Sequence, residues 1–156
     1  MIESKTASTL EANFRSAAAR TGRSLKTAIR ADVGESQAYG EAIFVRREIG
    51  LQRPEGANVQ GVDFITAAWN AQGQLWILVT DVKTSTVGKF PKPATIPWPD
   101  FPDLWRKEVK AAINRLSLDN KAREQEVTSA FAAGRVRLRQ INVDYSPAGQ
   151  GRKTGF

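Results

Sequence analysis

The feature that most constrains the fold of this chain is a pair of apolar segments, residues 62–69 and 75–82, separated by the polar stretch Asn70-Ala-Gln-Gly73. This pattern predicts a β-hairpin with a loop of about four residues. The second segment is apolar on both faces instead of alternating, which predicts a strand that is covered on both sides. The rest of the chain must therefore supply helices for both faces of one sheet.

The remaining segments fit around this hairpin. Apolar residues at helical spacing predict helices over residues 34–50, 103–116 and 118–133. Residues 135–139 alternate as a strand, and a β-bulge near Gln140 would join them to the apolar positions that follow. This order predicts an α/β fold: a mixed central β-sheet flanked by helices on both faces.

A length of 156 residues predicts a single domain. Residues 1–33 are expected to form a basic, helical N-terminal extension, residues 34–145 the core, and residues 146–156 a flexible basic tail. No apolar run approaches the roughly 18 residues of a membrane span, so no membrane-spanning segment is expected.

Composition restricts the chemistry. The chain contains no histidine and no cysteine, which excludes histidine-based triads, HExxH zinc sites and thiolate metal sites. Its net charge of +7 favours a polyanionic partner, namely nucleic acid, an anionic membrane surface or an acidic protein. If the protein is an enzyme, carboxylates, lysine and a bound cation must carry its chemistry.

Charged residues gather at one end of the predicted hairpin. Asp63 opens the first strand, and Asp81 and Lys83 close the second, where alternation places both on one face. Other acid-x-Lys triplets begin at Glu3, Glu108 and Asp119. Only the triplet at Asp81 lies on a predicted strand that has an acid at the start of its neighbour. The alternative is an exposed ion pair between Asp63 and Lys83, which stabilises little.

The helix before the hairpin offers a further carboxylate. Glu41 lies three residues after Ala38 and four before Val45, so the pattern places it on the core-facing stripe. A buried carboxylate is costly unless it is paired or binds a metal. Glu35, in a first turn where the helix dipole favours an acid, and Glu48, at the helix end, are the other candidates. Equally, Glu41 could reach water from the edge of the stripe.

A helix with a glutamate, a strand that opens Gly61-Val-Asp63 and a strand that ends Asp81-Val-Lys83 together resemble the PD-(D/E)XK nuclease superfamily. The similarity covers roughly residues 34–84, and Gly-Val-Asp stands where the motif has Pro-Asp. The resemblance implies a restriction-endonuclease-like core of the order αβββαβ, here with an N-terminal helical extension.

The resemblance also implies a chemistry. Asp63, Asp81 and the main-chain carbonyl of Val82 would hold one or two Mg²⁺ or Mn²⁺ ions, with Glu41 in support. Such hard cations take oxygen ligands and lower the pKa of a bound water. Lys83 would orient that water or stabilise the developing negative charge. The implied reaction is in-line hydrolysis of a phosphodiester.

Other basic and aromatic residues are candidates for contact with nucleic acid. Arg135, Arg137 and Arg139 alternate along the last predicted strand and would follow phosphates; alternatively, they protect an exposed edge strand. Lys89 and Trp98 lie in the proline-rich loop after the hairpin, where Trp98 would stack on a base.

Small, basic, histidine-free nucleases of this pattern resemble the C-terminal toxin domains of bacterial contact-dependent growth inhibition and related secreted polymorphic systems. This resemblance implies cleavage of tRNA or DNA in the bacterial cytoplasm after delivery as part of a secreted toxin. It also implies an acidic immunity protein that blocks the basic site. The alternatives are a repair or recombination nuclease acting on structured DNA, and a non-catalytic nucleic-acid-binding protein.

Overall fold

The centre of the molecule is a mixed sheet of five strands in the order β1-β2-β3-β4-β5. The structure is a computed structural model that describes residues 25–55, 61–147 and 152–155. The strands are β1 (Ile49–Gln52), β2 (Phe64–Trp69), β3 (Leu75–Ser85), β4 (Val136–Asp144) and β5 (Arg152–Gly155). Only the β3–β4 pair is parallel, and its neighbours on each side pair antiparallel. The chain therefore crosses over between β3 and β4.

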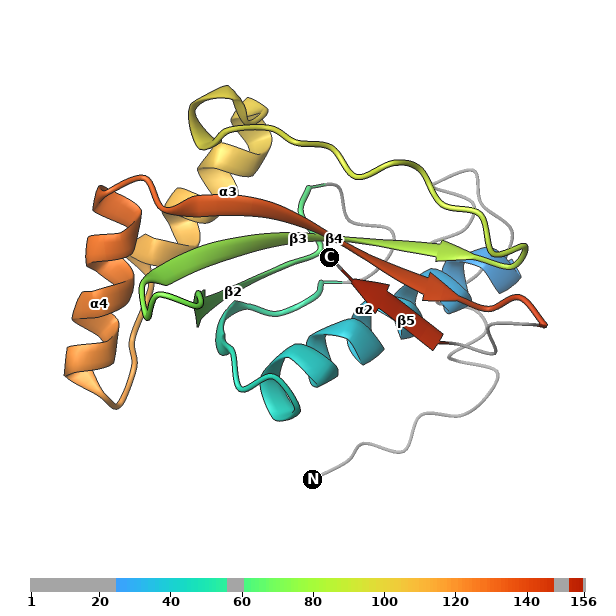
Figure 1. The fold of residues 1–156 in the computed structure, drawn as a ribbon, viewed down its shortest axis with the longest axis horizontal. Helices are drawn as coiled ribbons and strands as arrows, with labels where there is room; N and C mark the ends of the chain where they lie inside the picture. Colours follow the sequence, from blue (N-terminus) through green and yellow to red (C-terminus); the bar gives the residue numbers. More distant parts are fainter. Residues whose placement is uncertain (1–24, 56–60, 148–151, 156) are drawn as a thin grey trace.

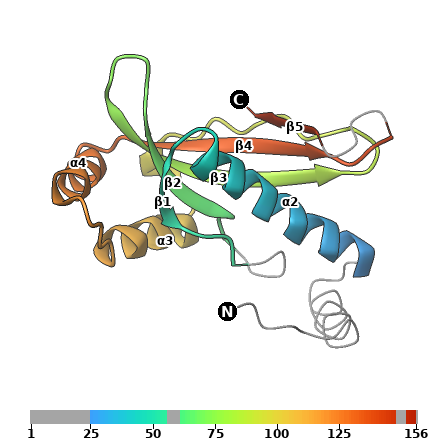
Figure 2. The same ribbon diagram turned by 90° about the horizontal axis from the view of Figure 1, so that it is seen from below.

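Helices cover both faces of this sheet (Figures 1 and 2). They are α2 (Leu25–Phe44) on one face, and α3 (Asp103–Asn114) and α4 (Lys121–Ala132) on the other, with the short 3-10 helix η1 (Trp98–Asp100) before α3. The predicted α/β fold, a mixed sheet flanked by helices, is confirmed. Within the described ranges, no helix has the length and apolar character that crossing a bilayer demands.

Strand β3 is covered on both faces, as its apolar sequence predicts. On the side of α3 and α4, Ile77 and Val79 belong to a core that includes Val109 and Val127. On the side of α2, Val82 belongs to a second core, formed with Phe64, Ile141, Val143 and the helix alanines. Alternating side chains of one strand thus stabilise two separate layers.

The predicted hairpin is confirmed. Its register runs from Phe64↔Thr80 to Trp69↔Leu75. In the loop, the Asn70 carboxamide oxygen accepts hydrogen bonds from the main-chain N–H of Gln72 at 3.0 Å and of Gln74 at 2.9 Å. Gly73 has a φ of 75°, a conformation that glycine adopts without steric cost.

Helix α2 differs from the prediction at both ends. It runs without a break through Gly34, where a Cβ would lie 2.6 Å from Thr84 Cγ2, so the glycine allows the helix to approach β3. It ends at Phe44, the chain turns through Arg47 with a φ of 59°, and Gly50 lies in β1 instead of ending the helix. Residues 1–24 of the predicted N-terminal extension lie outside the described residues.

The C-terminal part also departs from expectation. Residues 152–155, in the segment predicted to be a flexible tail, pair with β4 as β5. No bulge is present near Gln140, because β4 pairs with β3 without a shift from Val136 to Asp144. The apolar phase changes because Val136 and Leu138 pack in the core under α3 and α4, whereas Ile141 and Val143 pack under α2.

A buried ion pair connects the centre of the sheet with the turn after α2. The Arg139 guanidinium donates to the two carboxylate oxygens of Glu48 at 2.7 and 2.9 Å. Its Nε donates to Thr80 Oγ1 at 3.0 Å, and Thr66 Oγ1 donates to Glu48 at 2.6 Å. Both charged side chains are almost completely buried. The group therefore ties β2, β3, β4 and the α2–β1 connection at one point.

Replacement of one member of this pair should destabilise the fold strongly. We expect Glu48→Gln to lower the free energy of unfolding by about 3 kcal/mol, because it leaves a buried, unpaired guanidinium. The exposed pair Glu41–Arg46, at 3.2 Å, supplies the control, and Glu41→Gln should cost less than about 1 kcal/mol. Urea denaturation followed by circular dichroism measures both. Equal losses in the two variants would contradict this account.

Candidate functional site

The site lies at the start of β2, where β3 extends beyond its partner strand. The register of the two strands begins at Phe64↔Thr80, and β3 continues past this pair to Ser85. Asp63, just before β2, occupies the position of the next strand residue: its N–H donates to the Thr80 carbonyl at 3.0 Å. Its carboxylate accepts a hydrogen bond of 2.5 Å from the N–H of Val82. Asp63 is thus held in the plane of the sheet by the main chain of β3.

The structure brings Asp81 and Lys83 to the same place. They form an ion pair of 2.9 Å, and their side chains are 32% and 40% exposed. Asp81 also lies close to Asp63, and its charge raises the pKa of the Asp63 carboxyl. Because the N–H and C=O of one strand residue point to the same side, the carbonyl of Val82 faces the end of β2 as its N–H does. The geometry predicted for Asp63, Asp81 and Lys83 is therefore present.

A third carboxylate reaches Asp63 from α2, and it belongs to Glu35. The Glu35 side chain is close enough to Asp63 to lower the pKa of that carboxyl through side-chain hydrogen bonding, and the residue is only 6% exposed. It precedes Ala38 and Ala42 by three and seven residues, so it lies on the buried stripe of the helix. The sequence offers Glu35 as a candidate but favours Glu41, because a helix that starts at residue 34 makes Glu35 a first-turn residue. In the observed helix it lies mid-way along.

Glu41 and Glu48 lie elsewhere. Glu41 forms its ion pair with Arg46, and Val45, which was needed to place Glu41 on the core-facing stripe, is 73% exposed because the helix has ended. The prediction that Glu41 points into the core is therefore wrong. Glu48 is buried, but it binds Arg139. Glu35 is the helix glutamate that acts on the pKa of Asp63.

Crowding of acids changes the protonation of Asp63. Its pKa rises from the usual 3.8 to about 6, first because the carboxyl is buried and further because the charge of Asp81 is close. Hydrogen bonds from Val82 and with Glu35 lower the pKa and offset part of this rise. A cluster of this kind takes up a proton readily, and a cation would relieve the same repulsion.

The donors fit a hard divalent cation in kind, since they are carboxylate oxygens and a peptide carbonyl. The number of side-chain ligands is small. In the part of the chain that the structure describes, no group of three or more acidic side chains is placed to hold a metal ion. The fit thus concerns Asp63 and Asp81 as a pair. Glu35 lies behind them as a partner of Asp63.

Other polar residues fix the surroundings of the pair. Glu108 on α3 accepts a hydrogen bond of 2.8 Å from the N–H of Val62, directly before Asp63, and its burial raises its pKa. Gln140 is the β4 partner of Asp81, and its amide donates to the carbonyl of Pro91 at 2.9 Å. These contacts hold the segment before Asp63 and the loop after β3. Sequence spacing gives no signal for either.

The predicted row of arginines is not a continuous surface. Arg137 is exposed, and Arg135 is partly buried and donates to the Leu75 carbonyl at 2.9 Å. Arg139 is buried against Glu48, so the prediction that it tracks phosphates is wrong. Both Arg137 and Arg139 are on the α2 side of β4, but the turn after α2 covers only Arg139.

The two loop candidates differ. Lys89 is exposed. Trp98 packs edge-on against Phe101 and Phe131, with ring centroids 5.2 and 5.9 Å apart, and the Arg106 guanidinium lies 5.8 Å from its ring. These contacts make Trp98 part of the packing around η1, and its side chain is partly buried.

Comparison of the chain with protein-family models, with curated proteins and with solved structures gives no match.

The raised pKa of Asp63 predicts a pH dependence of stability. A carboxyl with a folded pKa near 6 and an unfolded pKa near 3.8 contributes stability that is present below about pH 4 and lost as the pH rises through 6. Asn mimics the protonated acid. From about pH 4 to pH 7, in the presence of a chelator, the wild type should lose on the order of 3 kcal/mol relative to Asp63→Asn.

Urea denaturation across this pH range measures the difference, and Asp119→Asn, at an exposed aspartate before α4, is the control. Parallel pH profiles of the wild type and Asp63→Asn would show that Asp63 ionises as an ordinary surface acid.

Proposed function

We propose that the protein is a metal-dependent nuclease that hydrolyses phosphodiester bonds of nucleic acid. The observation that carries this proposal is the grouping of Asp63, Asp81 and Lys83, with Glu35 behind it, where β3 extends past β2. A surface ion pair accounts for Lys83 and Asp81, but not for two further acids, Asp63 and Glu35, which are close enough to interact with each other and to shift the pKa of Asp63. Such crowding stabilises little unless a positive charge joins it.

The order of elements supports the same proposal. From α2 to β4 the chain runs helix, three strands, two helices and a strand. This is the αβββαβ order that resemblance to the PD-(D/E)XK superfamily implies, with α3 and α4 in place of a single helix. The acids and the lysine lie on the second and third strands, as the resemblance implies for the motif.

In this proposal, Asp63, Asp81 and the Val82 carbonyl hold one or two Mg²⁺ or Mn²⁺ ions. A bound ion supplies Lewis-acid chemistry: it lowers the pKa of a water and neutralises phosphate charge. Lys83, fixed by Asp81 at 2.9 Å, orients the attacking water or stabilises the negative charge that develops on the phosphate. Glu35 and the N–H of Val82 hold the Asp63 carboxylate in place.

The net charge of +7 supports a polyanionic substrate. We further propose, from the sequence resemblance, that the nuclease is a bacterial toxin domain that cleaves tRNA or DNA and is neutralised by an acidic immunity protein.

Divalent cations should switch the activity on, and the motif should be required for it. We expect the wild type with Mg²⁺ or Mn²⁺ to cut at least one of tRNA, plasmid DNA and branched DNA, which are compared to identify the substrate. Asp81→Asn and Lys83→Met should lower the rate by at least about 100-fold, because each removes a charge needed in the transition state. Asp119→Asn and Lys121→Met, in an acid-x-Lys triplet outside the site, should cut at the wild-type rate. A folded wild type that cuts none of these substrates with any divalent ion would overturn the proposal.

The choice of helix carboxylate can be tested separately. Glu35→Gln should lower the rate about 10- to 100-fold and weaken Mn²⁺ binding, because Asp63 loses the neighbouring carboxyl group that positions it. Glu41→Gln should change neither. Calorimetric titration with Mn²⁺ and cleavage assays measure the two effects. Loss of activity in Glu41→Gln alone would restore Glu41 as the supporting acid.

A further inference from the structure

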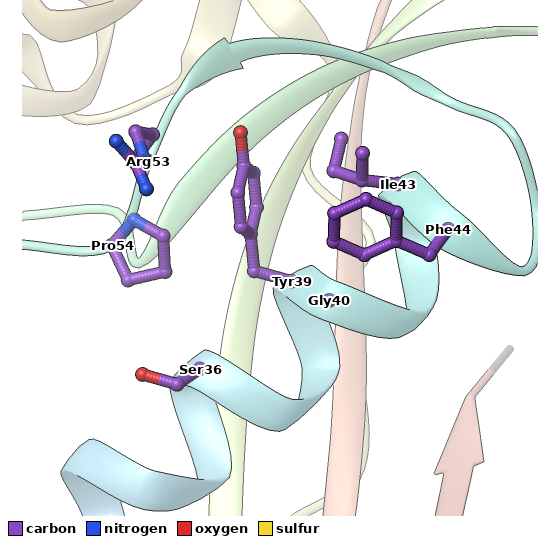
Figure 3. A pocket seen from close by; sticks show the side chains of 7 residues that line it. All are labelled: Ser36, Tyr39, Gly40, Ile43, Phe44, Arg53 and Pro54. Carbon is purple, nitrogen blue, oxygen red and sulfur yellow. The ribbon is translucent and has the colours of Figure 1, made fainter. Parts of the chain in front are cut away.

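A cavity of about 500 Å³ lies between α2 and the segment that follows β1. Figure 3 shows its walls: Tyr39, Ile43 and Phe44 project from α2, and Arg53 and Pro54 face them. The volume is in the range of pockets that bind small organic groups. None of the residues that line it is acidic, so it does not belong to the carboxylate cluster.

The cavity shares two elements with that cluster. Its lining on α2 includes Ser36, which directly follows Glu35, the glutamate that lowers the pKa of Asp63. Tyr39, in the wall of the cavity, packs against Phe64, the residue that directly follows Asp63. A strand that enters the cavity can therefore continue toward Asp63.

The walls offer flat apolar surfaces. Tyr39 packs edge-on against the buried Phe64, with ring centroids 5.3 Å apart and ring planes at 72°, so the core fixes its orientation. Phe44 is 78% exposed and the next residue, Val45, is 73% exposed, so the end of α2 presents apolar surface beside the cavity. Aromatic side chains in such positions bind nucleobases by stacking, and each stacked base contributes about 1–3 kcal/mol.

The polar groups at the cavity favour a ligand that carries negative charge. Arg53 is exposed, and its charge acts on the Tyr39 hydroxyl, where it opposes the rise in pKa that burial causes. The hydroxyl groups of Ser36 and Tyr39 can donate hydrogen bonds to the edge of a base. A flat apolar group joined to an anion describes a nucleotide.

We propose that this cavity binds one unpaired base of the nucleic acid, stacked between Tyr39 and Phe44, with Arg53 on an adjacent phosphate. The inference rests on the proposed nuclease function and adds a substrate class to it. A base inside a duplex cannot enter without being flipped out of its stack, at a cost of a few kcal/mol. The enzyme is therefore directed to single-stranded or looped nucleotides.

The test distinguishes binding that depends on the bases of the strand from binding that depends on its phosphates. Fluorescence anisotropy, with a chelator present to prevent cleavage, compares a short labelled single-stranded RNA or DNA with a strand of equal length that has every phosphate but no bases. Phe44→Ala and Tyr39→Leu should weaken binding of the base-bearing strand by about 5- to 100-fold and leave the baseless strand unchanged. Arg53→Gln should weaken binding of both strands.

Leu104→Ala is the control, because Leu104 is another exposed apolar residue, on α3 and outside the cavity. It should bind both strands as the wild type does. Circular dichroism shows whether each variant is folded. If Tyr39→Leu does not fold, the test depends on Phe44→Ala, because Phe44 is exposed and its replacement should leave the fold intact.

The possible failures are distinguishable. If the wild type cuts nucleic acid with Mg²⁺ but Phe44→Ala binds the base-bearing strand with wild-type affinity, the cavity proposal is overturned and the nuclease function stands. The same holds if Phe44→Ala impairs only binding to an acidic partner protein, which would identify the cavity as a protein-docking surface. If the wild type neither binds nor cuts any nucleic acid, both proposals are wrong.

Discussion

The structure depends on the buried pair of Arg139 and Glu48. Two charges removed from water are tolerated only when each is matched and their remaining hydrogen-bonding groups are satisfied. Here Thr66 and Thr80 supply the remaining hydrogen bonds. Thr80 directly precedes Asp81, so the interaction that satisfies the buried charges also fixes the strand that carries the candidate site. A small shift of β2 or β4 would leave a charge unpaired, and this requirement favours one register of the sheet over its neighbours.

The sequence was sufficient for features that depend on local periodicity. The hairpin follows from two apolar runs and a polar break, and strand alternation with antiparallel pairing brings Asp63, Asp81 and Lys83 together. These relations involve residues within about twenty positions of one another. Both faces of β3 being apolar likewise predicts helices on both sides, because an uncovered apolar face would remain in water.

Local periodicity could not predict which glutamate of α2 lies beside Asp63, nor which arginines of β4 are exposed. Choosing Glu35 over Glu41 requires knowing where α2 starts and ends and how it approaches β3, an approach that Gly34 allows. The alternation around Arg139 is that of an exposed basic strand, and only the turn after α2, distant in sequence, buries it against Glu48. Whether a charged side chain is buried depends on contacts with segments distant in sequence. The residues that neighbour it in the chain therefore do not indicate its burial.

The separation of Glu48 and Arg139 along the chain has a consequence for the order of folding. They are 91 residues apart. Closing so long a loop costs conformational entropy before the contacts it brings together can stabilise the fold, so it is a slow step. The hairpin with Asp63, Asp81 and Lys83 can form early and locally, but its strands are clamped only when β4 docks beside β3. During synthesis the acids and the lysine therefore exist for some time on an unclamped hairpin. Maturation of the site is a late event, coupled to completion of the sheet.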